Sequence, residues 1–166
     1  IVIENKILYT LNLREQLPHG FRTFITDDDF PLVHVRPIIS RVDITLIGYG
    51  RLSETLLEVA ERLFEENELV VEIICPTQIY PFDIKPISTF FDKSKALFIV
   101  EEGQGFAGFG SEVVTQIAEH NPSLLKKVKR IIPLETPIPA SGHLEKHMLP
   151  NADNIIKEIL EVLNEV

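Results

Sequence analysis

A glycine-rich loop is the first place in this sequence where residue types and spacing could do chemistry. The stretch EEGQGFAGFG at 101–110 holds a GxGxxG spacing in Gly103, Gly105 and Gly108. In dinucleotide-binding proteins such a loop follows a strand, opens a helix and lets the backbone approach a pyrophosphate. Here the two carboxylates that begin the stretch oppose an incoming anion, and no acidic residue lies about 20 positions beyond the last glycine to hold a ribose. Nucleotide binding is therefore the less favoured function of this loop.

The side chains around these glycines suit a protein interface better. Glycines allow a tight turn from which Phe106 and Phe109 can project against another surface. Glu101 and Glu102 could form a general acid/base pair, but neighbours along a strand point to opposite faces and do not share a proton. We expect one of them to cap backbone groups and the other to face solvent or a basic partner. The loop is thus predicted to contribute Phe106, Phe109, Glu101 and Glu102 to a subunit interface, and to hold no catalytic residue.

Two further sets of residues could bind a metal or act as nucleophiles. His143, Glu145 and His147 lie in HLEKH, which puts the two imidazoles on one face if the segment is helical. The order differs from the HExxH of zinc enzymes and no third ligand is evident, so we expect surface histidines and no metal site. Cys75 ends an apolar run without a patterned histidine or a second cysteine, so it is predicted to be a small buried side chain.

The composition excludes several classes of function. The chain has 166 residues, 16 basic and 25 acidic side chains, a net charge of −9 and 45% hydrophobic residues. These values predict one folded domain, favour a basic partner and argue against nucleic-acid binding. The longest apolar runs are strand-sized, whereas a membrane span needs about 20 residues, so no membrane segment is expected. A single cysteine fits a reducing compartment, and we expect the cytoplasm or an organelle matrix.

The start of the chain indicates a piece of a longer protein. The only methionine is Met148, and the chain opens on the apolar residues Ile1, Val2 and Ile3. We therefore expect missing chemistry to lie outside this sequence.

Regular secondary structure is predicted from residue 42 onward. Short apolar runs predict strands at 42–48, 69–75, 96–100 and 128–132, and amphipathic spacing predicts helices at 53–66, 83–91, 110–120 and after residue 151. Asp83 and Asn151 are the expected helix caps. Before residue 41 the irregular pattern predicts a linker with a short strand or two. The alternation of buried strands with helices predicts an α/β fold whose sheet is mostly parallel. In such a sheet, ligands and partners meet the loops after the carboxyl ends of the strands.

An ordered set of motifs resembles a known family. The motifs are ENKILY at 4–9, DITLIGYG at 43–50, ICPTQIYPFDI at 74–84, EEGQGFAGFGSE at 101–112 and TPIPASGHLEKHMLPNAD at 136–153. Together they resemble the C-terminal domain of the transketolase-like thiamine enzymes. The likeness is strongest to the beta subunit of the decarboxylating component of 2-oxo acid dehydrogenase complexes, of the pyruvate, branched-chain or acetoin type. The last motif is the most specific because it separates this subgroup from transketolase proper.

The resemblance implies a three-layer αβα sandwich around a mostly parallel sheet of about five strands, with room for one antiparallel strand. It implies that residues 1–40 are the tail of an upstream pyrimidine-binding domain plus a linker, and that residues 41–166 form the transketolase-like C-terminal domain. The family's catalytic glutamate and histidine, and its metal and diphosphate site, belong to parts that this chain lacks. No catalytic, cofactor-binding or metal-binding residue is therefore carried over to this chain, although the parent enzyme would use thiamine diphosphate and magnesium.

The resemblance also implies partners. It predicts a beta-subunit homodimer, contact with an alpha subunit or fused upstream domains, and docking of the acyltransferase core through its small basic peripheral subunit-binding domain. The acidic final helix, with Glu158, Glu161 and Glu165, is the predicted docking surface. The whole enzyme would decarboxylate a 2-oxo acid on thiamine diphosphate and pass the acyl group to a lipoyl arm, in the cytoplasm or, in a eukaryote, in the mitochondrial matrix.

Two other functions stay open at this point. The chain could be a free-standing nucleotide-binding α/β domain that uses Gly103, Gly105 and Gly108. It could also be the same domain of a transketolase or of a ferredoxin-linked oxidoreductase.

Overall fold

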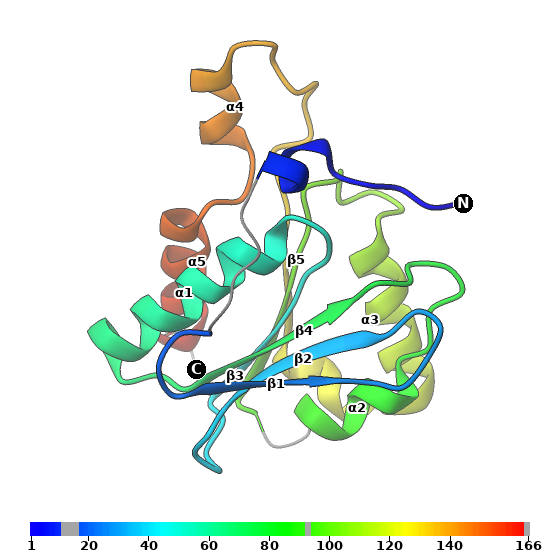
Figure 1. Ribbon diagram of the computed structural model, residues 1–166, viewed down its shortest axis with the longest axis vertical. Coiled ribbons are helices and arrows are strands. Elements are labelled where there is room, and N and C mark those ends of the chain that lie inside the picture. The colour runs from blue at the N-terminus through cyan, green and yellow to red at the C-terminus, as the bar shows by residue number, and fades with distance from the viewer. Residues whose placement is uncertain (11–16, 92–93, 165–166) are drawn as a thin grey trace.

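A six-stranded mixed sheet runs through the centre of the molecule (Figure 1). The computed structural model describes residues 1–10, 17–91 and 94–164. Within these ranges the sheet has the order β1-β2-β4-β3-β5-β6. The strands are β1 (Phe21–Ile25), β2 (Leu32–Pro37), β3 (Ile44–Ile47), β4 (Val71–Pro76), β5 (Ala96–Val100) and β6 (Val128–Ile131). Parallel pairs join β4, β3, β5 and β6, whereas β2 pairs antiparallel with both β1 and β4.

Helices cover both faces of this sheet and make three layers. The helices α1 (Leu52–Asn67) and α5 (Ala152–Asn164) pack on one face, and α2 (Lys85–Phe91) and α3 (Phe109–His120) pack on the other (Figure 1). The short helix α4 (Gly142–Met148) extends beyond the layers and buries none of its residues. Two short 3-10 helices, η1 (Lys6–Thr10) and η2 (Pro122–Lys127), complete the described elements. No helix among the described residues is long and apolar enough to cross a membrane.

The predicted α/β sandwich is confirmed, with one correction to the sheet. The sheet has six strands instead of about five, because the segment before residue 41 supplies both β1 and β2. The strand at 96–100 has the bounds predicted from the sequence, and the other predicted strands and helices are found within a few residues of their expected ends. Both expected caps are also present: Asp83 accepts a hydrogen bond from the Lys85 amide at 2.9 Å, and Asn151 accepts one from the Asn154 amide at 3.1 Å.

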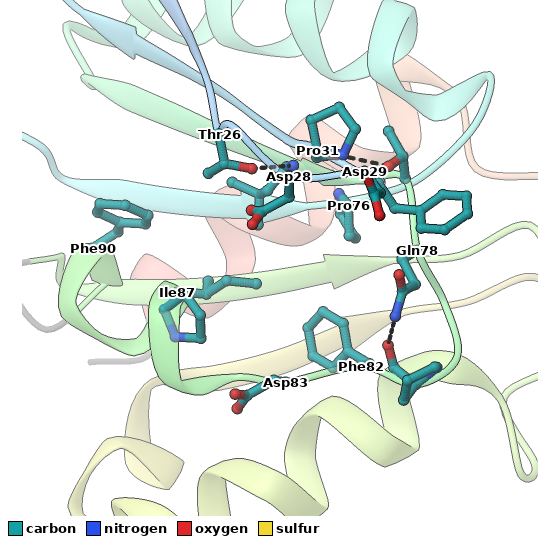
Figure 2. A pocket seen from close by; sticks show the side chains of 15 residues that line it. Thr26, Asp28, Asp29, Pro31, Pro76, Gln78, Phe82, Asp83, Ile87 and Phe90 are labelled. Atoms are coloured by element: carbon teal, nitrogen blue, oxygen red, sulfur yellow. Dashed lines mark hydrogen bonds between the residues drawn. The ribbon is translucent and has the colours of Figure 1, made fainter.

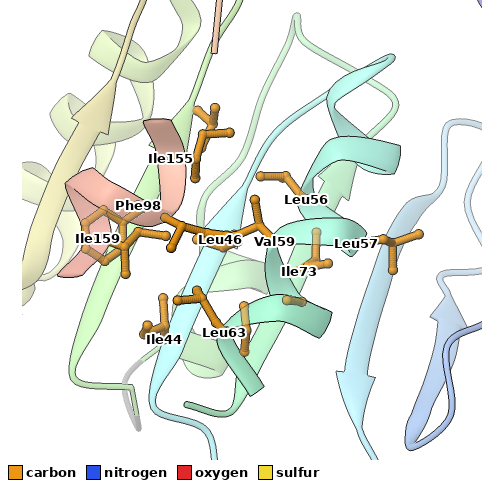
Figure 3. Close-up of a cluster of buried hydrophobic side chains, with 14 of the residues drawn as sticks. Ile44, Leu46, Leu56, Leu57, Val59, Leu63, Ile73, Phe98, Ile155 and Ile159 are labelled. Carbon is orange, nitrogen blue, oxygen red and sulfur yellow. The ribbon is translucent and has the colours of Figure 1, made fainter. Parts of the chain in front are cut away.

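Two apolar layers hold the helices to the sheet. Figure 3 shows the layer under α1 and α5, where Leu56 and Leu63 of α1 meet Leu46 of β3 and Ile155 and Ile159 of α5. The apolar positions of α1 recur at helical spacing, so one face of the helix is buried while its acidic residues face outward. The opposite layer lies between the sheet and α2 and α3, and includes Ile47, Ile74, Ile87, Ile99 and Val113.

Polar groups are also buried in the sheet. The Glu72 carboxylate, on β4, accepts a hydrogen bond from the Thr45 hydroxyl at 2.8 Å and lies 2.9 Å from His34 Nε2. All three side chains are buried. His34, which is isolated in the sequence, is therefore paired in the fold, and its ring also packs against Phe90 with a centroid distance of 4.4 Å.

Candidate functional site

The loops after β3 and β5 meet where the order of the sheet reverses. The chain passes from β3 to β4 on one side, then crosses to β5 on the other side of β3. In open α/β sheets, the crevice outside the carboxyl ends of the strands at such a point is the usual place for a ligand or partner. Here the crevice is formed by residues 48–51 and 101–108. Gly50 has a φ of +61°, a left-handed conformation that favours glycine in this turn.

Three of the four glycines between residues 103 and 110 lie in close packing, and Gly103 is the exception. A side chain on Gly105 would collide with the Ile132 side chain, and one on Gly108 would place Cβ 2.6 Å from the Gln104 carbonyl oxygen and 2.9 Å from a Glu101 carboxylate oxygen. A side chain on Gly110 would likewise collide with the Glu101 carboxylate. In a phosphate-binding loop, the glycines leave open space so that the protein backbone can approach the ligand closely. The GxGxxG spacing here instead accommodates neighbouring groups of the same chain.

Glu101 is the buried centre of this loop. The residue is only 1% exposed, and neither carboxylate oxygen has a hydrogen-bond partner among the residues that the structure describes. Glu101 therefore does not fill the backbone-capping role that the sequence predicts for one of the two glutamates. The carboxylate lies against Gly108 and Gly110, at the N-terminus of α3, where the helix dipole favours a negative charge. A pyrophosphate at this helix end would have to displace or oppose that charge.

The two aromatic residues of the loop have different environments. Phe106 is 87% exposed, as a residue that contacts another surface must be. Phe109 is only 9% exposed and packs edge-to-face on Tyr49 and Phe82, with centroid distances of 5.3 and 4.8 Å. The expected projection of Phe109 is thus corrected: as the first residue of α3, its ring turns inward and holds the loop to the core.

Arg130 fastens the loop to the neighbouring strand. Its guanidinium, on β6, donates to the Gly105 carbonyl at 2.7 Å and to the Ser111 hydroxyl at 2.6 Å. The sequence does not indicate this role, because Arg130 belongs to a basic run at 126–130 that is typical of a solvated turn leading into a strand. In the fold the Arg130 side chain is half-buried.

A cavity of about 880 Å³ opens beside the crevice. Its lining includes Tyr49, Arg51, Glu54 and Glu102, together with residues 3–5 and a set of apolar side chains. Burial raises the pKa of the Tyr49 phenol, and the negative charges of Glu101 and Glu102 raise it further. The apolar part of the lining belongs to the layer under α1 and α5 and includes Leu17, Val33, Val35, Leu57, Ile73 and Cys75.

Cys75 is chemically quiet in this cavity. Burial raises the pKa of its thiol to about 12, and the negative charge of Glu54 adds to the shift. The prediction of a small buried side chain is confirmed.

The predicted docking helix presents part of its acidic face. Glu161 is exposed and lies 3.8 Å from Lys157, and Glu158 is half-buried. Burial raises the pKa of the Glu158 carboxyl, and Glu161 adds to the shift while Lys129 opposes it. Glu165 lies outside the described residues. The two described glutamates therefore lie near lysines of their own chain.

The segment after β6 exposes apolar side chains on an arm that includes α4. Leu134, Ile138 and Leu144 are each more than half exposed. His143 and His147 do lie on one helical face, with ring centroids 4.7 Å apart. Among the described residues, however, no group of three or more His, Cys, Asp and Glu side chains could hold a metal ion.

The site does not fit a diphosphate cofactor. The helix end that would receive phosphate carries the buried Glu101 carboxylate, and two of the three loop glycines are packed against Ile132, Gln104 and Glu101. The described residues provide no acidic cluster for magnesium. What the arrangement offers is a rigid loop that displays one aromatic side chain, next to an arm with exposed apolar residues.

Comparison with known proteins gives a family match and two curated relatives with the same kind of name. The family model described as "Transketolase, C-terminal domain" matches residues 35–155. The pyruvate dehydrogenase E1 component subunit beta of Caenorhabditis elegans, a mitochondrial protein, is 31% identical over 99% of this chain and 46% of its own length. The acetoin:2,6-dichlorophenolindophenol oxidoreductase subunit beta of Bacillus subtilis is 32% identical over 74% of this chain and 36% of its own length. The chain thus spans about half, or less, of the length of these curated relatives.

A solved structure shares the fold at lower identity. A split-gene transketolase, described as an inactive beta4 tetramer, superposes with a TM-score of 0.63 at 19% identity, covering 74% of this chain and 39% of that chain. At this identity the likeness concerns the fold alone.

Proposed function

Because this chain belongs to the transketolase C-terminal domain family, we propose that it is the assembly and partner-docking domain of a beta subunit in a 2-oxo acid dehydrogenase complex. The observation that carries the proposal is the glycine loop. It is fixed from within by Glu101, Phe109 and Arg130, yet it presents Phe106 almost fully exposed. A large aromatic side chain held on a rigid loop is typical of an interface anchor.

The proposed interface joins two beta subunits. Phe106 supplies the aromatic anchor and Glu102 a charge at its edge, whereas Phe109 and Glu101 shape the loop from inside the chain. The exposed Leu134, Ile138 and Leu144 follow the neighbouring strand β6 and extend the apolar surface at the same edge of the sheet. Upstream domains, or a separate alpha subunit, complete the parent enzyme in this proposal.

The reaction itself belongs to parts outside this chain. We infer that the parent enzyme decarboxylates a 2-oxo acid, with thiamine diphosphate and magnesium supplying the chemistry, and passes the acyl group to a lipoyl arm. The misfit between the Glu101 loop and a diphosphate supports placing that cofactor elsewhere. We also infer that residues 1–40 are the tail of a pyrimidine-binding domain plus a linker and that residues 41–166 form the family domain, although β1 and β2 of the first segment pair into the common sheet.

A second docking surface is assigned to the final helix. Glu158 and Glu161 of α5, together with Glu165, would receive the small basic domain of the acyltransferase core, and a net charge of −9 favours such a partner. The proposed location is the cytoplasm or, in a eukaryote, the mitochondrial matrix, in keeping with the mitochondrial relative from Caenorhabditis elegans.

The interface is tested with Phe106→Ser in the full-length protein that contains this chain. Loss of the anchor is expected to weaken self-association about tenfold or more, measured by sedimentation velocity over a concentration series. Phe64→Ser is the matched control, because Phe64 is also an exposed phenylalanine but lies near the end of α1, away from the loop. Unchanged association of Phe106→Ser, or equal weakening by Phe64→Ser, would contradict the proposed interface.

Ligand binding separates this proposal from the nucleotide alternative. A ligand that binds the native state must raise the melting temperature of the chain. We expect none of NAD, ADP, and thiamine diphosphate plus magnesium to bind this chain, so a thermal-shift series with them should leave the melting temperature unchanged. A saturable rise with NAD or ADP that Gly105→Ala abolishes would restore the glycine loop as a phosphate site. A rise with thiamine diphosphate would place cofactor residues in this chain. Substrate assays of the parent enzyme distinguish the proposal from a transketolase or a ferredoxin-linked oxidoreductase.

A further inference from the structure

The strand β1 forms an open edge of the sheet. Among the described residues it pairs with β2 alone, and four of its five residues are exposed. At its two ends, the Gly20 carbonyl and the Thr26 amide form hydrogen bonds with the other strand of the hairpin, at 2.8 and 3.1 Å. Because backbone groups alternate in direction along an antiparallel strand, the N–H and C=O groups of Thr23 and Ile25 point to the outer edge. These groups are available to another strand.

Two arginines lie side by side on this hairpin. Arg22 of β1 is directly opposite Arg36 of β2, an arrangement in which like charges repel each other. Both guanidinium groups lie over the Phe24 ring, 5.1 and 5.6 Å from its centre. Within the described part of the chain neither arginine forms an ion pair, and Arg36 Nε is buried without a hydrogen-bond partner. An unsatisfied donor beside two unneutralised charges indicates a negatively charged partner.

The other end of the same hairpin is acidic. The turn that joins β1 to β2 contains Asp27, Asp28 and Asp29, which are exposed and form no ion pair with a described residue. Figure 2 shows Asp28 and Asp29 on this turn. The Thr77 hydroxyl donates to the Pro31 carbonyl at 2.7 Å and so holds the turn to the segment after β4. The hairpin therefore carries positive charge at the start of β1 and negative charge beyond its end.

This distribution of charge is self-complementary. Two copies of β1 that pair antiparallel about a two-fold axis at Phe24 place the start of each strand opposite the end of the other. In this register Thr23 of one copy faces Ile25 of the other, so their outward backbone groups satisfy each other. The arginine pair of each copy then lies next to the acidic turn of the other. Phe24 and Ile25, which are 45% and 65% exposed, are covered by the same residues of the second copy.

We propose that β1 is a docking edge for a second copy of this chain, through antiparallel pairing of the two β1 strands in which the arginine pair of each copy meets the acidic turn of the other. The contact is separate from the interface proposed for the glycine loop, because β1 and β6 lie at opposite edges of the sheet. Both contacts can form at once, and together they join more than two copies.

Sedimentation velocity of the full-length protein that contains this chain tests the contact. Every sample carries Phe106→Ser, which removes association through the glycine loop; if that interface does not exist, this substitution has no effect and the β1 contact is still measured. The Phe106→Ser protein is expected to dimerise with a dissociation constant below about 100 μM. Thr23→Pro should weaken this dimer about tenfold or more, because proline removes an outward N–H and leaves the bonds to β2 intact. Thr23→Ala keeps that N–H and is the matched control.

Charge reversal tests the complementarity of the two ends. Arg22→Glu with Arg36→Glu makes both ends of the hairpin acidic, and Asp27→Lys with Asp28→Lys makes both ends basic. Each of these variants is expected to associate with itself about tenfold or more weakly, because like charges then meet. An equimolar mixture of the two should restore association, because opposite charges meet again.

The control for charge reversal is Lys129→Glu with Lys157→Glu, which reverses two exposed charges outside the hairpin and should leave the dimer unchanged. Three results would overturn the proposal. These are a Phe106→Ser protein that stays monomeric at about 100 μM, equal association of Thr23→Pro and Thr23→Ala, or a mixture of the two charge variants, each folded by its thermal melt, that does not associate. If a charge variant fails to fold, the comparison of Thr23→Pro with Thr23→Ala decides.

Discussion

The carboxylate of Glu101 occupies the space into which a side chain at Gly110 would point. This contact joins the end of β5 to the first turn of α3 and determines why the loop between them is rich in glycine. The same contact explains why a sequence that matches a phosphate-binding pattern does not form a phosphate-binding loop.

Gly110→Ala tests that contact. An alanine inside a helix normally stabilises it by about 1 kcal/mol relative to glycine, but here the added methyl must displace a buried carboxylate and is expected to cost about 1–3 kcal/mol of unfolding free energy. Urea denaturation measures the change. Gly103→Ala is the control, because its Cβ would come no closer than 3.9 Å to the Tyr49 hydroxyl. The penalty should shrink in a Glu101→Ala background, and additivity of the two changes would contradict the contact.

Glu72→Leu is expected to lower the unfolding free energy by about 3–5 kcal/mol, because it leaves the buried Thr45 hydroxyl and His34 ring without their carboxylate partner. Chemical denaturation gives the value. Glu68→Leu, at the exposed end of α1, serves as the control for removal of a glutamate charge. A loss of unfolding free energy below about 1 kcal/mol would show that Thr45 and His34 do not depend on the Glu72 carboxylate as their buried partner.

Asp43 makes stability depend on acid. Burial raises the pKa of its carboxyl, but hydrogen bonds from Arg41, the Val70 amide and Lys95 outweigh burial and hold the pKa below its usual value. A depressed native pKa stabilises the fold above the unfolded value near 4, and this contribution disappears as the pH falls through the lower native value. Asp43→Asn should therefore cost about 1–3 kcal/mol at pH 7 and progressively less below about pH 4. Thermal melts across that range measure the difference, and a constant gap between the two proteins would refute it.

Cys75 is expected to resist alkylation in the folded chain. With its pKa raised to about 12 by burial, almost no thiolate is present at neutral pH. Iodoacetamide should label it about a hundredfold or more slower than the same chain in denaturant, followed by mass spectrometry. Labelling at the rate of the unfolded chain would contradict the burial of the Cys75 thiol and show that it is reactive in the folded chain.

The sequence predicted most elements and little of the site geometry, for identifiable reasons. Apolar runs at β5 and helical spacing in α1 are local signals, and both elements were found where expected. The segment before residue 41 is predicted as a linker with a short strand or two because its pattern is irregular, and the structure shows why the signal is weak: four of the five β1 residues are exposed. Burial of Glu101 depends on glycines seven and nine positions away, and the buried pair of His34 and Glu72 joins residues 38 positions apart. Such contacts between distant residues are set by the topology of the fold, so no periodic pattern in the sequence predicts them.

Glu72 also determines how the strands are aligned. Every residue of β3 and β4 is buried, so both faces of these strands are largely apolar and a shift by one residue would exchange one apolar set for another. Hydrophobic pattern alone would tolerate that slip. Thr45 and Glu72 are directly paired, however, and a shift would turn the carboxylate into the opposite apolar layer, away from Thr45 and His34. One buried acid thus selects a single alignment among neighbours that differ little in apolar burial.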